Sequence, residues 1–69
     1  MKLLEVVALM EDVPEKGLRR GQVGTIVEEL RDGFFEVEFS GLDGKAYAFA
    51  ALAAEKLMIL RHEPSELAA

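Results

Sequence analysis

Four glutamates on two neighbouring stretches come closest, in type and spacing, to a chemical site. Glu28 and Glu29 end one β-type stretch, and Glu36 and Glu38 alternate with apolar residues in the next. Paired carboxylates can act as general acid and base or bind calcium. Such catalysis needs a carboxyl group whose pKa is raised by burial, and a flat, exposed face supplies none. We therefore expect no catalytic residue, and interpret Glu28, Glu36 and Glu38 as a solvated face or a patch for a basic partner.

Two aromatic residues complete the partner-binding hypothesis. Phe34 lies beside a turn and alternates in phase with Glu36 and Glu38, so it can serve as an exposed apolar anchor. The alternative is that Phe34 packs beneath a long loop. Tyr47 is the single tyrosine, and aromatic residues line the grooves of many peptide-binding modules. Its alternative role is to cover one end of the fold.

Basic residues support a second hypothesis, a nucleic-acid- or ribosome-associated protein. Lys16, Arg19 and Arg20 lie close together in one loop, and Arg31 lies in a later turn. Against this stand three acidic residues in the same loop, a net charge of −5 and the absence of tryptophan for base stacking. We expect a solvated loop with local ion pairs, and keep nucleic acid as the alternative.

Composition excludes several other functions. There is no cysteine and only one histidine, His62, so we expect no thiolate chemistry, no metal site and no cofactor. A chain of 69 residues leaves little room for a ligand pocket of about 300 Å³, and we expect no enzyme. The apolar start is interrupted by Glu5 and is far shorter than the ~20 residues of a membrane span. We therefore expect a cytoplasmic protein with no membrane partner.

Hydrophobic periodicity and turn residues predict an all-β fold. Asp32-Gly33 between two β-type stretches is a strong hairpin signal, and the segment from Gly41 to Gly44 predicts a second turn. Gly24 inside a stretch indicates a bulge or a close backbone approach. Residues 11–21 predict a long loop held by Val13 or Leu18. The expected strands are 5–10, 22–30, 34–39, 45–50 and 57–60.

The stretch Ala46–Lys56 is ambiguous, because alanine favours helix whereas aromatic and small residues alternate as in a strand. We expect a strand to about Ala50, then one helical turn over Ala51 to Glu55. The result is a small, partly open, five-stranded barrel over residues 1–61, followed by a polar, frayed tail over 62–69. The expected core is Val7, Leu9, Val23, Val27, Phe35, Val37, Phe39, Leu57 and Ile59.

The segments Gly21-Gln22-Val23-Gly24-Thr25-Ile26-Val27 and Asp32-Gly33-Phe34-Phe35-Glu36-Val37-Glu38-Phe39 resemble a bacterial family of very short SH3-like proteins, a domain of unknown function. The resemblance covers roughly residues 3–61. These two segments are also similar to the SH3-like subunit of photosystem I, and the same barrel shape occurs in transcription-elongation and ribosomal proteins. The family resemblance implies an SH3-like barrel, a bacterial cytoplasmic setting and no known catalytic residues. In some members it implies a partner encoded nearby, in the manner of an antitoxin and its toxin.

The resulting functional hypothesis is a non-catalytic module that binds a basic partner protein. Its predicted site is Phe34, Glu36, Glu38, Glu28 and Tyr47. Homo-oligomers are a further expectation, since the edges of an incompletely closed barrel can pair.

Overall fold

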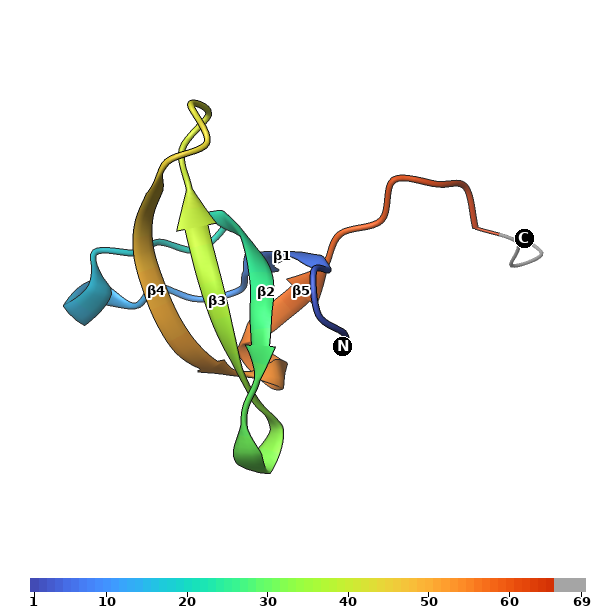
Figure 1. Cartoon of the computed structure of the whole chain (residues 1–69), viewed down its shortest axis with the longest axis horizontal. Helices are drawn as coiled ribbons and strands as arrows, with labels where there is room; N and C mark the ends of the chain where they lie inside the picture. Colours follow the sequence, from blue (N-terminus) through green and yellow to red (C-terminus); the bar gives the residue numbers. More distant parts are fainter. Residues whose placement is uncertain (66–69) are drawn as a thin grey trace.

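The structure is a computed structural model that describes residues 1–65, and it confirms the all-β prediction. Five antiparallel strands form one sheet in the order β4-β3-β2-β1-β5 (Figure 1). The strands are β1 (Val6–Leu9), β2 (Val23–Glu29), β3 (Phe34–Ser40), β4 (Ala46–Ala53) and β5 (Leu57–Ile59). The helical elements of the described residues are three short 3-10 turns, η1 (Pro14–Lys16), η2 (Arg31–Gly33) and η3 (Ala54–Lys56).

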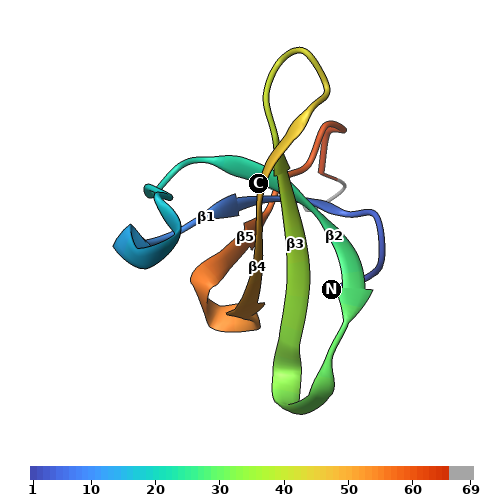
Figure 2. The ribbon, with the colours of Figure 1, turned by 60° about the vertical axis from the view of Figure 1, so that its left-hand side comes forward.

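The sheet bends around its own inner face. β1 and β5 run across the direction of β3 and β4, as the two views in Figures 1 and 2 show. β4 and β5 are the two edges and do not pair with each other, so the sheet is not closed into a barrel. η3 carries the chain from one edge to the other. The predicted partly open arrangement is therefore present.

Both predicted hairpins form, and the first has the geometry that its sequence favours. Asp32 and Gly33 have φ angles of 59° and 77°. The N–H of Phe34 donates to the carbonyl of Arg31 and closes the turn. Positive φ at both central residues defines a type I′ turn, which matches the twist of the flanking strands. In the second hairpin the N–H of Gly44 donates to the carbonyl of Gly41 at 2.9 Å.

The core is built from the inward positions of every strand. Of the expected core, Val7, Leu9, Phe35, Val37, Phe39 and Leu57 are buried, and Ile59 packs against them. The prediction that Val23 and Val27 belong to the core was wrong, because their side chains are 46% and 38% exposed. Pairing with β3 directs Gly24 and Ile26 inward instead. Val27 is the extra residue of a β-bulge between Ile26 and Glu28, which simple alternation does not anticipate.

Gly24 lies at the centre of the sheet, opposite Val7 on one side and Phe39 on the other. A Cβ atom at this position would lie 2.6 Å from Cγ1 of Val37 and 2.9 Å from the carbonyl oxygen of Glu38. The close approach expected at Gly24 is thus present, while the bulge lies three residues later. Only glycine leaves room for this packing of β2 on β3.

The alanine-rich stretch remains a strand for longer than expected. β4 continues to Ala53, which lies opposite Phe34, and the helical turn is η3 rather than residues 51–55. Leu52 and Ala53 are 6% and 7% exposed, so burial against the core overrides the helical preference of alanine. Residues 62–65 of the expected tail belong to no strand or helix, and residues 66–69 lie outside the described part.

We predict that Gly24→Ala destabilises the fold by about 1–3 kcal/mol, because the added methyl group must displace Val37 or the backbone of Glu38. Urea denaturation measures the change. Gly41→Ala is the matched control, since a Cβ there would meet only the side chain of Asp43, at 3.1 Å. We expect the control to change stability by less than about 1 kcal/mol. Equal losses in the two variants would contradict the role assigned to Gly24.

Candidate functional site

The hairpin of β2 and β3 gathers three of the predicted carboxylates on the outer face of the sheet. Glu36 and Glu38 alternate with the buried residues of β3, and both are half-buried. Glu28 lies directly opposite Glu36, so the bulge at Val27 brings it onto the same face. Like charges in opposite positions repel and reduce stability. We call the surface formed by Glu28, Glu36, Glu38 and Phe34 the acidic hairpin face.

Aromatic side chains border these carboxylates. Phe34 shares the alternation of Glu36 and Glu38 and is 42% exposed. On the neighbouring strand β4, Phe49 lies opposite Glu38 and is 49% exposed. The sequence analysis did not single out Phe49, because alternation along the strand does not by itself show which of its two faces is buried. The outward position follows from pairing, since it is Ala50 that lies opposite the buried Val37.

Tyr47 is not part of the acidic hairpin face. It is the extra residue of a bulge between the pairs Phe39–Ala48 and Ser40–Ala46. Its hydroxyl accepts a hydrogen bond from Nε2 of Gln22 at 2.9 Å, and its ring centroid is 6.4 Å from that of Phe39. These contacts correspond to the alternative role, covering one end of the fold. Of the five predicted site residues, the structure brings together four and separates Tyr47.

The first loop, residues 10–22, folds back on itself beside β4. Val13 and Leu18 form an isolated bridge whose two backbone hydrogen bonds measure 2.9 and 3.1 Å. The side chain of Leu18 is 1% exposed and belongs to the core. Asp12 accepts a hydrogen bond from the N–H of Arg20 at 2.9 Å. The loop is therefore fixed by one buried side chain and by its own backbone, as the sequence indicated for Val13 and Leu18.

A groove of about 370 Å³ lies between the first loop and the end of β4, so the chain has a hollow larger than the ~300 Å³ for which we expected little room. Its apolar lining comes from Val13, Phe34 and the four successive β4 residues 50–53. Its charged lining is Glu11, Asp12, Glu15, Glu55, Lys16 and Lys56. Phe34 thus belongs both to the groove and to the acidic hairpin face. It shares the groove with the first loop but is 42% exposed, so it is not packed beneath the loop as its alternative role required. The sequence could not reveal the groove, because its two sides are brought together only by the bend of the sheet.

One ion pair fixes the first loop to η3. Nζ of Lys56 donates to Oε1 of Glu11, and the N–H of Met10 donates to the carbonyl of Lys56 at 2.9 Å. The hydrogen bond to Glu11, and then its negative charge, raise the pKa of Lys56 above its ordinary value of 10.5. Glu55 and Glu15 add smaller contributions in the same direction. Four carboxylates against two lysines leave the groove negative, and three carboxylates and one lysine remain after the Lys56–Glu11 pair is set aside.

The predicted basic residues do not form one continuous surface. Lys16, Arg19 and Arg20 lie on the first loop, whereas Arg31 lies in the β2–β3 turn, which projects from a different part of the molecule (Figures 1 and 2). Within residues 1–65 the recorded ion pair is Lys56–Glu11, so none involves these four side chains. The expected local ion pairs of Arg19 and Arg20 are therefore absent from the described residues.

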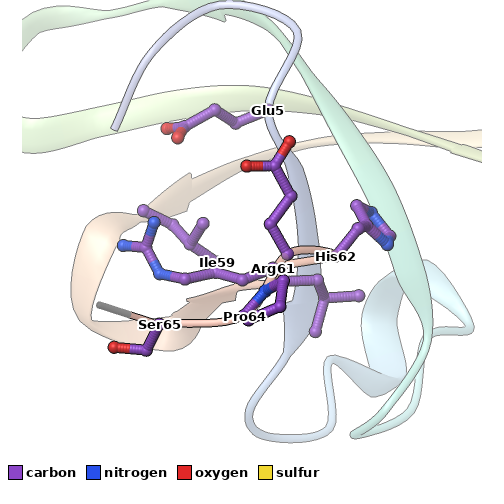
Figure 3. Close-up of a pocket in the computed structure, with 8 residues that line it drawn as sticks. Glu5, Ile59, Arg61, His62, Pro64 and Ser65 are labelled. Atoms are coloured by element: carbon purple, nitrogen blue, oxygen red, sulfur yellow. The ribbon is translucent and has the colours of Figure 1, made fainter. Parts of the chain in front are cut away.

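A second hollow, of about 570 Å³, lies where the chain leaves β5. Glu5, Arg61, His62 and Pro64 are among the residues that line it, and Arg61 and His62 point to opposite sides (Figure 3). Within residues 1–65, no three or more His, Cys, Asp or Glu side chains are grouped so that they could hold a metal ion. In the same part of the chain, no helix is long and apolar enough to cross a membrane.

Comparison with known proteins identifies a family but no close relative. The family described as Domain of unknown function (DUF4926) matches residues 3–59. No curated protein and no solved structure shows significant similarity to the chain.

We predict that Glu11→Gln lowers the pKa of the Lys56 ammonium toward 10.5, because the charged acceptor is lost. NMR titration of the Lys56 side chain measures the pKa directly, and Glu63→Gln is the control variant. Because this pKa is raised by folding, the ion pair stabilises the protein below pH 10.5, and its contribution is lost as the pH rises through the folded-state pKa. An unchanged Lys56 pKa in Glu11→Gln would show that the pair does not persist in solution.

Proposed function

The chain belongs to the family described as Domain of unknown function (DUF4926), and from this premise we propose that it is a non-catalytic interaction module. Its ligand is a basic partner protein, which binds the acidic hairpin face. The observation that carries the proposal is the position of Glu28 opposite Glu36, beside the exposed aromatic rings of Phe34 and Phe49.

The charge arrangement supports a basic partner. No lysine or arginine within residues 1–65 forms an ion pair with Glu28, Glu36 or Glu38. The repulsion between opposed carboxylates therefore stays uncompensated in the free protein, and a partner's cations would relieve it on binding. One lysine in place of Glu28 would turn this repulsion into attraction, so the carboxylate at this position lowers the stability of the free protein.

The aromatic residues support a protein rather than a small cation as the ligand. Protein interfaces typically combine a few aromatic anchors with a polar rim. Phe34 and Phe49 are each nearly half exposed and lie on neighbouring strands beside the carboxylates. They can bury apolar surface against a partner while Glu36 and Glu38 contribute charge.

The proposal extends to fold type and cellular setting. The long first loop and the 3-10 turn before the last strand support an SH3-like assignment. The resemblance to short bacterial proteins supports a place in the bacterial cytoplasm, with an antitoxin-like role beside a neighbouring partner as one form of the function.

We predict that the double variant Glu36→Lys/Glu38→Lys binds the partner at least ten-fold more weakly, a loss of about 1.4 kcal/mol. The partner is captured from a native lysate with the wild-type protein, purified and titrated by calorimetry against each variant. Glu63→Lys, which makes the same change of charge in the tail, is the control and should bind normally. Undiminished binding by the double variant would remove the acidic hairpin face as the site.

The single variant Glu28→Lys separates binding from folding. Facing Glu36, the new lysine replaces repulsion with attraction, and we expect a gain of roughly 0.2–1 kcal/mol in unfolding free energy. The same variant should bind the partner more weakly. A protein that is more stable and yet binds less well cannot owe the loss of binding to unfolding. Chemical denaturation and calorimetry provide the two measurements, and a loss of stability would contradict the stated geometry.

The nucleic-acid alternative gives a different expectation. Because Lys16, Arg19 and Arg20 are separated from Arg31, we predict no shift of duplex DNA or of an RNA hairpin in a gel at low salt. Binding that weakens steeply with added salt, and that disappears in Arg19→Ala/Arg20→Ala, would establish the alternative instead.

A further inference from the structure

The edge strand β4 lacks most of the features that usually protect a sheet edge. Its sequence, Ala-Tyr-Ala-Phe-Ala-Ala-Leu-Ala, contains neither a charged residue nor a proline over eight positions. The bulge at Tyr47 interrupts only its beginning, and the pairing from Ala48 to Ala53 is regular. Edges of soluble proteins are commonly blocked by lysine, proline, bulges or a covering segment, because free backbone groups attract another strand. The regular part of β4 is therefore open to pairing.

The backbone of β4 has hydrogen-bonding capacity to spare. Alternate residues of an edge strand direct their N–H and C=O groups away from the sheet. Within residues 1–65, no backbone hydrogen bond joins β4 to any segment other than β3. The groove lies on this side, because four successive residues, 50–53, line it. Side chains alternate between two faces, so a continuous run of lining residues means that the strand edge itself borders the groove.

We propose that the groove receives an extended segment of the partner protein, which adds to β4 as a further strand. This inference rests on the proposed function and specifies how the partner is held. The stretch of β4 that borders the groove, residues 50–53, is about 13 Å long, at roughly 3.3 Å per residue. A groove of about 370 Å³ is within the range of peptide- and ligand-sized sites and far too small for a folded domain.

The lining of the groove specifies the chemistry of the segment. Glu15 and Glu55 have no recorded ion pair, whereas Glu11 is held by Lys56. Basic side chains of the segment would meet the free carboxylates, and apolar ones would meet Phe34 and Val13. A strand presents its side chains alternately to two faces, so the matching segment alternates apolar and basic residues.

A second copy of this chain fits the groove less well. The first loop faces the end of β4 across the groove and is held there by Leu18 and by the Glu11–Lys56 ion pair. A symmetric β4–β4 pair would bring a second first loop toward the same space. It would also place two acidic proteins, each of net charge −5, in contact. A single basic segment meets neither obstacle.

The test uses an eight-residue peptide that alternates valine and arginine. Backbone amide shifts in NMR titrations of the full chain report where the peptide binds. Two further peptides carry N-methyl groups, one on every valine and the other on every arginine. In a strand the two sets of amides point to opposite edges, so only one set can pair with β4. We expect shifts centred on residues 50–53, and a loss of at least ten-fold in affinity for one methylated peptide only.

Protein variants test the charge and apolar contacts. Glu55→Lys and Phe34→Ala should each weaken binding of the peptide, while Glu63→Lys, in the tail, should not. An equal effect of the two methylations, shifts away from β4, or no binding would overturn the inference. A dimer formed through β4 without peptide, seen by sedimentation and by shifts at residues 48–53, would overturn it in favour of a second copy. The variant Glu36→Lys/Glu38→Lys tests the proposed function separately. It is measured by capture of the partner, whereas the strand-addition inference is measured by comparing the two methylated peptides.

Discussion

The rest of the structure depends on the close packing at Gly24. This residue is paired with Val7 of β1 and with Phe39 of β3, so it joins the two parts of the bent sheet. The absence of a Cβ atom lets β2 lie against the side chain of Val37 and the backbone of Glu38. The bend brings the first loop, which follows β1, beside the end of β4. The groove therefore depends on a bend of the sheet in which β2 and β3 pack closely only because position 24 is glycine.

The filling of the inner face determines what the outer face displays. Phe35, Val37 and Phe39 occupy the inside of β3, and the residues opposite them on β4, which are Leu52, Ala50 and Ala48, point to the same inner face. The side chain of Phe49 is therefore outside, next to the carboxylates. In a chain this short, few residues are available for a core, and aromatic rings on the surface represent apolar area withheld from it. That cost to stability is consistent with a surface used for binding.

Local signals in the sequence predicted a large part of this fold, and tertiary contacts account for the rest. The turn at Asp32-Gly33 and the alternation of β3 depend on neighbouring residues, so they could be read directly. Val23 and Val27 were misplaced because the register of β2 depends on its partner strand and on a bulge. The extent of β4 was underestimated because burial of Leu52 outweighs helix propensity. All four residues of the acidic hairpin face were predicted from the sequence, whereas the groove and the outward position of Phe49 were not.

The uncharged edge of β4 also bears on how the protein behaves at high concentration. Most sheet edges carry their own local charges against unwanted pairing, but here the strand carries none. Besides the first loop, which faces the end of β4, the remaining protection is the mutual repulsion of molecules with a net charge of −5. Such protection is collective and depends on the medium: it weakens as ions screen it and vanishes near the isoelectric point of about 4.7. The acidity of this chain therefore counters self-association, in addition to the recognition role that we propose for it.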